Sequence, residues 1–296
     1  MLAGGTGGAK LAAGLAAQLD SADLTVIANT GDDEEFWGLL VCPDVDAVIY
    51  RLAGVFNEQA GYGMRDETFH ALEMLQRLGE QAWFRIGDKD LGVHVLRAEM
   101  LRRGATLTEA CLELCRRFGV GARVLPMSDQ PVRTRCITGR GEFSLQEYFV
   151  RERLEPALVA IEFDGIEAAR PTSAVLRALE EADLVIIGPS NPLISIDPIL
   201  RVVRPALRRE RTVVVTPLVG GVALKGPTVE MMRALGLEVS PVEVARRYRD
   251  VASGFVLDET DRDLAPSIEA FGYRVVIGPT VMDDGGRRLA AALLGA

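Results

Sequence analysis

Four glycines near the start of the chain are well suited to binding a phosphate group. They lie in the segment GGTGGAK, Gly4 to Lys10, between a short apolar run and an amphipathic stretch. Glycine lets the backbone approach a ligand closely, and the free N–H groups and dipole at the start of a helix attract anions. The segment therefore predicts a phosphate site; the alternative is a tight turn between a strand and a helix.

This segment differs from both common phosphate-binding loops. In a P-loop, Gly precedes the lysine and Ser or Thr follows it, whereas Ala9 and Leu11 flank Lys10 here. In the dinucleotide fingerprint, the sixth position counted from Gly5 is Gly or Ala, and here it is Lys10. A nicotinamide-dependent dehydrogenase is therefore disfavoured.

Aspartates follow the next apolar run, residues 24–30. Asp32 and Asp33 come directly after it in NTGDDEE, and Asp44 and Asp46 follow in CPDVDAVIY. Facing an anion site, these carboxylates indicate a divalent cation that bridges to phosphates. Mg²⁺ needs only one or two of them, because phosphate and water supply its other oxygens. A solvated acidic loop remains an alternative, and Asp44 could instead be the N-cap of the helix that follows.

Two further apolar runs end in polar, glycine-bearing loops. GPSNP, with Ser190 and Asn191, ends the run 183–190, and its side chains can hydrogen-bond a base or a ribose. The run 211–217 ends in TP and leads into GGVALKGP, which contains Lys225. Parallel strands end at one edge of a sheet, so we expect these loops to lie near the glycine segment. By itself, GDKD at 87–90 favours a turn.

A parallel sheet is needed to bring these loops together, and the order of the apolar runs predicts one. The β-branched runs are 24–30, 183–190, 211–217, 253–259 and 273–280, and the amphipathic stretches are 9–19, 172–182, 197–209 and 240–251. Buried strands that alternate with helices are typical of a parallel sheet covered on both faces. We predict one α/β domain over residues 1–296, Rossmann-like and doubly wound, with a mostly parallel sheet. Its first strand is short, Met1 to Ala3.

The stretch from about residue 53 to 118 has a different pattern. It contains three helix-like segments and no strong strand, which predicts a largely helical insertion after the second strand. Short β segments are expected after it, at 123–138 and 142–150. Because ligands bind at the carboxyl edge of such sheets, we expect the insertion to cover the active-site crevice.

Composition excludes several classes of protein. Among 296 residues, 33 Lys and Arg stand against 42 Asp and Glu, a net charge of −9, which lacks the basic footprint of nucleic-acid binding. No run of eighteen apolar residues and no signal-like start is present, so we expect a cytoplasmic protein with no membrane span. Four cysteines and two histidines favour neither a disulfide framework nor a zinc site. Without a nucleophile motif, phosphoryl or nucleotidyl transfer fits best.

A series of motifs from Gly4 to near the C-terminus resembles the 2-phospho-L-lactate transferase (CofD) family of coenzyme F420 biosynthesis. In chain order they are GGTGGAKL, NTGDDEEFWGL, CPDVDAVIY, DETF, FRIGDKDLGVH, LPMSDQPVRT, LQEYFV, GPSNPLISIDPIL, TPLVGGVALKGP and VLDETDRD. The resemblance implies a GDP-activated donor carrying 2-phospholactate or enolpyruvyl phosphate, and the deazaflavin Fo as acceptor through its ribityl hydroxyl. It also implies release of GMP, a requirement for Mg²⁺, and a homodimer.

The same resemblance implies roles for individual residues. The donor would bind Gly4, Gly5, Thr6, Gly7, Gly8, Lys10, Ser190 and Asn191. Asp32 would hold the metal with help from Asp46 or Asp33, and Asp32 and Asp46 would act in catalysis. Fo would contact Asp46, Arg85, Tyr62 and Lys89.

Two positions depart from the family pattern. Tyr62 replaces the tryptophan of a GWG motif, although tyrosine can still stack on a tricyclic ring. Lys89 replaces the arginine of GDRD, which removes a bidentate partner for phosphate or carboxylate. The alternative function is a regulator. Related gluconeogenesis-factor proteins share the GGTGG and GDD segments and bind nucleotide-sugars without turnover, whereas DETF, GDKD and SNPLIS favour the transferase.

Overall fold

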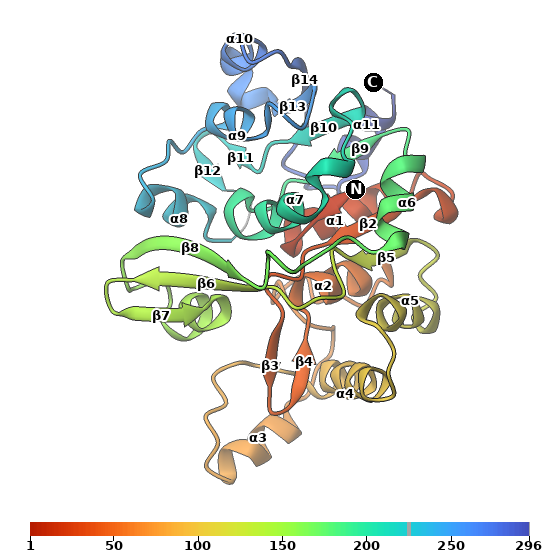
Figure 1. Cartoon of the computed structure of the whole chain (residues 1–296), viewed down its shortest axis with the longest axis vertical. Helices are drawn as coiled ribbons and strands as arrows, with labels where there is room; N and C mark the ends of the chain where they lie inside the picture. Colours follow the sequence, from red (N-terminus) through yellow and green to blue (C-terminus); the bar gives the residue numbers. More distant parts are fainter. Residues whose placement is uncertain (224–225, 296) are drawn as a thin grey trace.

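A seven-stranded parallel sheet forms the centre of the computed structural model, which describes residues 1–223 and 226–295 (Figure 1). Lys225 lies outside the described residues. The strand order is β14-β13-β10-β9-β1-β2-β5. The strands are β1 (Leu2–Ala3), β2 (Thr25–Ala28), β5 (Arg123–Pro126), β9 (Val185–Ile187), β10 (Thr212–Val215), β13 (Gly254–Asp258) and β14 (Arg274–Gly278).

This order confirms the predicted doubly wound, Rossmann-like fold. The chain starts at the centre with β1, moves outward through β2 to β5, and returns to β9 on the other side of β1. The direction of winding therefore reverses between β1 and β9. In sheets of this kind, ligands bind beyond the carboxyl ends of the strands at that reversal.

Alternating side chains of the strands feed two apolar cores, one on each face. Ile27 packs in one core, and its neighbours Val26 and Ala28 pack in the other. The first core is covered by α6 (Ser173–Glu181), α7 (Asp197–Val203), α8 (Thr228–Ala234), α9 (Pro241–Tyr248) and α10 (Ala265–Glu269). The second is covered by α1 (Gly5–Ala16), α2 (Pro43–Leu52), α5 (Leu107–Arg117) and α11 (Arg287–Leu294). No helix among the described residues has the length and apolar character needed to cross a membrane.

The predicted helical insertion is present. It contains α3 (His70–Arg77), α4 (Asp88–Arg102) and α5, with α3 farthest from the central sheet (Figure 1). Helix α5 begins with a capping box, in which the Thr106 side chain accepts from the Glu109 N–H and the Glu109 carboxylate accepts from the Thr106 N–H. Helix α5 packs on β5 and α4, which ties the insertion to the sheet.

The β segments after the insertion differ from the prediction. The first of them is β5, the edge strand of the main sheet, paired in parallel with β2 from Thr25 and Arg123 onward. A separate antiparallel sheet has the order β7-β6-β8, with β6 (Arg133–Thr138), β7 (Gly141–Ser144) and β8 (Leu158–Asp164). Strand β8 was not predicted, although its sequence LVAIEFD begins with four apolar residues.

A hairpin of β3 (Glu34–Phe36) and β4 (Leu39–Val41) was also not predicted. Its first strand begins with two glutamates, which conceal the strand pattern. The turn residues Trp37 and Gly38 both have positive φ, 50° and 77°, as a tight two-residue hairpin turn requires.

Candidate active site

The loops that follow β1 and β9 pack directly against each other where the sheet reverses. The Gly4 N–H donates to Ser190 Oγ at 3.1 Å. A Cβ atom on Gly7 would lie 2.4 Å from the carbonyl oxygen of Pro189, and one on Gly8 would lie 2.6 Å from Ser190 Oγ. The glycines thus allow this close packing, and the two segments predicted to bind the donor lie together.

The predicted glycine loop forms the first turn of α1, which begins at Gly5. Thr6 and Lys10 are half-buried in the first two turns of this helix. Asn191 lies at the start of the turn 192–196, where its Oδ1 accepts from the Leu193 N–H at 2.9 Å. Its Nδ2 donates to Met231 Sδ at 3.8 Å, so both sides of the amide are already engaged within the protein.

A carboxylate from α2 closes the start of α1. Asp44 Oδ1 accepts from the Gly5 N–H at 2.5 Å, and its Oδ2 accepts from Asn29 Nδ2 at 2.8 Å. Asp44 does not cap its own helix, because α2 begins at Pro43 without a side-chain cap. Burial raises the pKa of Asp44 to about 6, although the hydrogen bonds from Asn29 and Gly5 lower it.

Asp32 lies near Asp44, just beyond the carboxyl end of β2. Its Oδ1 accepts from Gln146 Nε2 at 2.6 Å. Burial, and then the neighbouring charge of Asp44, raise the pKa of Asp32 well above its ordinary value. Gln146 was not among the predicted site residues, although it belongs to the LQEYFV motif.

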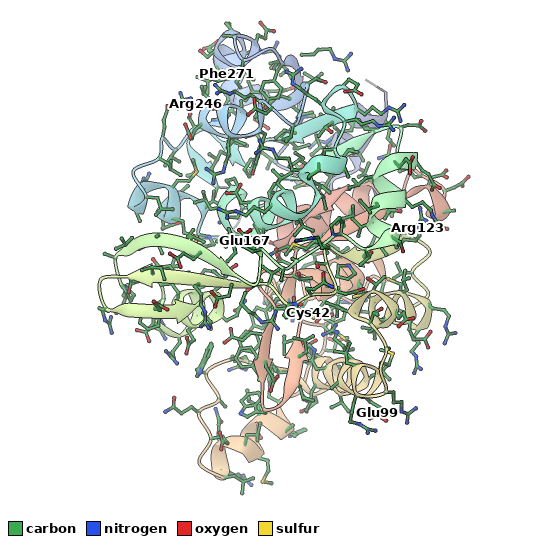
Figure 2. All side chains as sticks on the ribbon, in the orientation of Figure 1. Cys42, Glu99, Arg123, Glu167, Arg246 and Phe271 are labelled. Carbon is green, nitrogen blue, oxygen red and sulfur yellow. The ribbon has the colours of Figure 1, made fainter. Side chains whose placement is uncertain are left out.

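Asp33 is buried beside hydroxyl groups that have no hydrogen-bond partner. Burial raises its pKa to about 8, against the effect of a hydrogen bond from Cys42, which lies where the β3–β4 hairpin meets α2 (Figure 2). Within the described residues, Asp33 Oδ1, Thr30 Oγ1 and Thr134 Oγ1 are buried and unpaired. Thr134 is held next to this loop by a bond from its N–H to the Gly31 carbonyl, 2.8 Å long.

These unpaired oxygens fit a divalent cation. Mg²⁺ prefers oxygen ligands, and a bound cation would lower the raised pKa values of Asp32 and Asp33. Within residues 1–223 and 226–295, no group of three or more His, Cys, Asp or Glu side chains is arranged to hold a metal ion. An ion at this position would therefore need phosphate or water to complete its coordination.

Asp46 is engaged in a buried ion pair with Arg97. Its Oδ1 accepts from Arg97 Nη2, and the Arg97 side chain is 0% exposed. Arg97 Nη1 also donates to the Leu40 carbonyl at 3.2 Å. The resemblance assigns metal and acceptor contacts to Asp46. In the structure, its carboxylate is paired with Arg97.

A row of buried polar groups continues from Asp46 to a cavity. His94 Nδ1 lies 3.8 Å from Asp46 Oδ2, and His94 Nε2 lies 3.3 Å from Asp90 Oδ1. Tyr50 donates its hydroxyl proton to Asp90 Oδ1 at 2.5 Å. Burial raises the pKa of Asp90, but His94, Tyr50 and Arg97 together lower it more.

Tyr62 and Arg85, both predicted to contact Fo, line that cavity together with Asp90. The cavity has a volume of about 370 Å³. The Arg85 guanidinium lies 4.4 Å from the centre of the Phe69 ring, and Tyr62 is 51% exposed. Lys89 does not line the cavity; its Nζ donates to the Arg65 carbonyl at 2.9 Å.

The DETF and GDKD segments cap each other's helices beside this cavity. Glu67 accepts from the N–H groups of residues 89–90 at the start of α4, at 2.9 Å each. Asp88 accepts from the N–H groups of residues 70–71 at the start of α3, at 3.0 Å each. A Cβ atom on Gly87 would lie 2.2 Å from Glu67 Cδ, so a larger residue there would displace the capping carboxylate. GDKD therefore begins a helix rather than forming an isolated turn.

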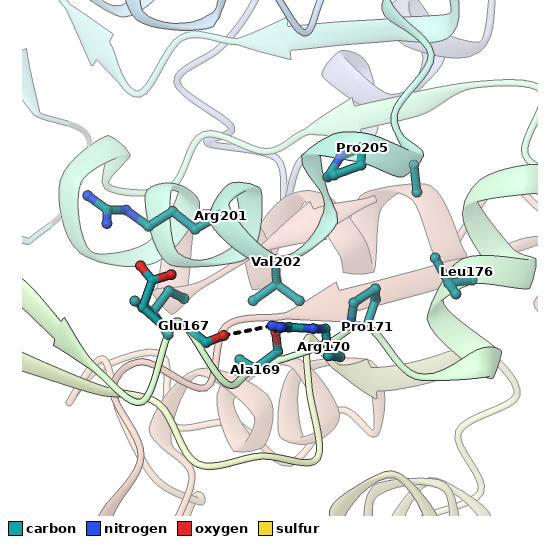
Figure 3. Close-up of a pocket in the computed structure, with 10 residues that line it drawn as sticks. Glu167, Ala169, Arg170, Pro171, Leu176, Arg201, Val202 and Pro205 are labelled. Carbon is teal, nitrogen blue, oxygen red and sulfur yellow. Dashed lines mark hydrogen bonds between the residues drawn. The ribbon is translucent and has the colours of Figure 1, made fainter.

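A larger cavity of about 600 Å³ lies between α6, α7 and the turn that follows β8 (Figure 3). Arg170 in its wall donates Nη1 to the carbonyls of Glu167 and Ala169, both at 2.8 Å. None of its lining residues belongs to the strand-end loops or to the predicted site. Size therefore does not identify the active site here.

Comparison with known proteins agrees with this geometry. The model of the family described as 2-phospho-L-lactate transferase CofD matches residues 1–269. The chain belongs to the CofD family. It is similar to the 2-phospho-L-lactate transferase of Methanosarcina barkeri, at 37% identity over 95% of this chain and 92% of that protein. It is also similar to the phosphoenolpyruvate transferase of Streptomyces griseus, at 40% identity over 96% and 92%.

A solved structure supports the fold of this CofD chain. A UPF0052-family protein of Bacillus halodurans matches with a TM-score of 0.63 and 17% identity, over 99% of this chain and 97% of that one. This match confirms the predicted Rossmann-like fold. The family and its named relatives confirm the predicted enzyme class. The chain is a transferase of phosphate-containing groups.

Several polar residues of this CofD chain were not identified from its sequence. Asn29 was passed over as part of NTGDD, although it contacts three different segments. His94 and Arg97 were not singled out either. A signal was available, since Asp90, His94 and Arg97 are spaced i, i+4 and i+7, which places three ionisable side chains on one helical face.

Proposed function

We propose that this chain transfers the phospho-acid part of a GDP-activated three-carbon acid to the ribityl hydroxyl of the deazaflavin Fo. The transferred group is 2-phospholactyl or enolpyruvyl phosphate, the products are F420-0 or dehydro-F420-0 and GMP, and the reaction requires Mg²⁺. Membership of the CofD family and the names of its relatives support this proposal. The chain is further proposed to be a cytoplasmic, single-domain homodimer that binds neither nucleic acid nor membrane.

The observation that carries the proposal is the meeting of three loops at the reversal between β1 and β9. The glycine segment forms the start of α1, the loop after β9 supplies Ser190, and the loop after β2 supplies Asp32 and Asp33. The N–H groups of Gly4 and Gly5 already donate to Ser190 and Asp44, so the donor would use the N–H groups that follow them in the first turn. Helix-start N–H groups suit the diphosphate of the donor, with guanosine toward Ser190 and Asn191. Asp32 and Asp33 are the carboxylates that would hold Mg²⁺, which offsets the negative charge of the diphosphate.

The transfer itself needs alignment rather than a protein nucleophile. The Fo hydroxyl oxygen forms a bond to the phosphorus distal to guanosine, and the bond from that phosphorus to the bridging oxygen breaks. GMP departs with the electron pair, and a phosphodiester remains. An aspartate of the loop after β2 would accept the hydroxyl proton. It must be ionised to do so, and bound Mg²⁺ would favour the ionised form by lowering the raised pKa values of Asp32 and Asp33.

The cavity near α4 supports Fo as the acceptor. Tyr62 and the stacked pair of Arg85 and Phe69 offer planar surfaces suited to a flat ring system. Asp90 forms part of the wall, and the polar row through His94 joins it to Asp46. Fo bound there would lie over the segment that the resemblance assigns to it.

An anaerobic incubation tests the proposal and identifies the donor. The protein is mixed with Fo, GTP, Mg²⁺ and a guanylyltransferase that makes the activated donor, and products are identified by mass. Phosphoenolpyruvate and 2-phospholactate are supplied in separate tubes. We expect a phosphodiester of Fo in one tube. No adduct in either tube, while an established transferase works in parallel, would contradict the proposal. Tight binding of a nucleotide-sugar without turnover would then favour the regulator.

A further inference from the structure

Asn29 and Asp44 form a hydrogen-bonded pair at the centre of the strand-end loops. Their side chains belong to the loop after β2 and to the first turn of α2, and they meet through Asn29 Nδ2 and Asp44 Oδ2 at 2.8 Å. Asn29 is 0% exposed and Asp44 is 5% exposed. Neither residue has a role in the function proposed above.

The pair connects all the loops that converge at the reversal of the sheet. Asp44 accepts from Gly5 N–H in the glycine segment. Asn29 Oδ1 accepts from the Gly31 N–H at 2.8 Å, next to Asp32, and Asn29 Nδ2 also donates to the Ile194 carbonyl at 3.2 Å, beyond β9. Two side chains therefore fix the glycine segment, the aspartate loop and the loop after β9 relative to one another.

The contacts require that the pair consist of one carboxylate and one amide. Asp44 receives two N–H donors, one on each oxygen, and an asparagine there would offer only one acceptor oxygen. Asn29 donates through nitrogen and accepts through oxygen at the same time, which an aspartate cannot do when ionised. The space is also tight, because a Cβ atom on Gly4 would lie 2.5 Å from Asp44 Oδ2.

We propose that Asn29 and Asp44 are positioning residues, which hold the glycine segment and the Asp32 loop at the separation that group transfer requires. The inference rests on the proposed function, because that function places the donor diphosphate at the glycine segment and the metal-binding carboxylates in the Asp32 loop. Transfer rates fall steeply when reacting groups are displaced by about 1 Å. The pair touches no substrate and acts only through the loops that it joins.

Exchanging the two residues gives a direct test. Asp44→Asn places two amides against each other, and Asn29→Asp places two carboxylates against each other. In the double variant Asn29→Asp with Asp44→Asn, the amide now at position 44 can donate to the carboxylate now at position 29 and still accept from Gly5, while the bond to the Ile194 carbonyl is lost. That carboxylate can in turn accept from Gly31. Asp258→Asn serves as the matched control, since Asp258 is a buried, hydrogen-bonded aspartate at the end of β13, away from the reversal.

Two measurements separate positioning from stability. The first is kcat and KM for transfer, together with the Kd for GDP by calorimetry. We expect each single variant to lower kcat by roughly 10-fold to 100-fold, as misalignment does, with GDP affinity changed by about 3-fold or less. The exchanged variant recovers most of kcat, and Asp258→Asn keeps the kcat of the unmodified protein while melting at a lower temperature.

The second measurement is the amide NMR spectrum, which does not depend on turnover. The Gly5 and Gly31 signals are expected to shift in both single variants and to return toward their original positions in the exchanged variant. If the unmodified protein shows no transfer while these shifts occur, the proposed function fails and the geometry of the pair stands. Single variants that fold and keep full kcat would overturn the positioning role. An exchanged variant that does not fold, or that folds and stays as slow as the singles, would overturn it as well.

Discussion

Glu67, which precedes α3, caps the start of α4, and Asp88, at the start of α4, caps the start of α3. Glu67 accepts from the first N–H groups of α4, and Asp88, the first residue of α4, accepts from the first N–H groups of α3. This exchange locks the segment 66–70 to the start of α4, and the cavity that contains Tyr62 and Arg85 lies at that junction. The shape of the proposed acceptor site therefore depends on Glu67, which lines the cavity, and on Asp88, which does not.

Replacing Glu67 should weaken both the junction and the cavity. Glu67→Ala leaves two helix-start N–H groups without an acceptor, and we expect a loss of about 1 kcal/mol in the free energy of unfolding. Fo should also bind more weakly, since Arg85 and Asp90 lose their support. Chemical denaturation and Fo fluorescence titration measure the two effects. Glu73→Ala, an exposed position on α3, is the control; equal behaviour of the two variants would contradict the capping role.

Replacing Asp32 should remove activity while leaving the fold intact. Asp32→Asn retains an oxygen that can accept from Gln146, so the circular dichroism spectrum and melting temperature should change little. Transfer should fall by on the order of 10²-fold or more, because the alignment of metal and phosphate is lost. Steady-state rates with saturating Mg²⁺ check this. A variant with the original rate would remove Asp32 from the active site.

Adding one methyl group to Gly7 should separate the loops after β1 and β9. In Gly7→Ala the new Cβ atom meets the Pro189 carbonyl oxygen at 2.4 Å, and a backbone atom cannot rotate away. We expect a loss of about 1–3 kcal/mol in stability and weaker GDP binding. Gly92→Ala is the control, because Gly92 is an exposed interior residue of α4 with no atom within 4 Å of a new Cβ, and there we expect a gain of about 0.5–1 kcal/mol. A Gly7→Ala variant as stable as the original protein would contradict the close packing.

Stability at acidic pH should depend on Asp258. Hydrogen bonds from Thr260 and Thr280 hold the pKa of Asp258 below its ordinary value, although burial opposes them. The stabilisation is therefore present above the pKa of the unfolded chain and is lost as the pH falls through the lower pKa of the folded state. Asp258→Asn should cost about 1 kcal/mol at pH 7 and progressively less as the pH falls below about 4. Urea denaturation across this range measures it; a cost independent of pH would show that the charge is not involved.

The central strands could be predicted from sequence because their burial is nearly complete. Val185 to Ile187 and Val213 to Val215 belong to continuous apolar runs, which only a sheet covered on both faces produces. Strand β5 was predicted only as part of a short β segment and not as a strand of the main sheet. Its four residues end in Pro126 and carry no sign of their partner, and parallel pairing with β2 spans about a hundred residues of sequence.

The arrangement of the candidate site was predictable in part for a similar reason. The segment 4–8, Asp32 and Ser190 all follow strands of the parallel sheet, so they lie at its carboxyl edge, as their positions after apolar runs indicated. The environment of Asp46 could not be foreseen, because its partner Arg97 lies 51 residues away and on another helix. Similarly, the alternative considered for Asp44 was a cap on the helix nearest in sequence, whereas its carboxylate accepts from Gly5 N–H at the start of α1.

The most direct test of this account is the stoichiometry of transfer. Purified protein is incubated with Fo, Mg²⁺ and preformed GDP-activated donor, with and without EDTA, and GMP and the Fo phosphodiester are measured together by mass. We predict that the two products appear in a one-to-one ratio, that neither forms with EDTA, and that Asp32→Asn slows both equally. Fo left unchanged while the donor is intact, or GMP released without the phosphodiester, would contradict the assignment of this site to group transfer.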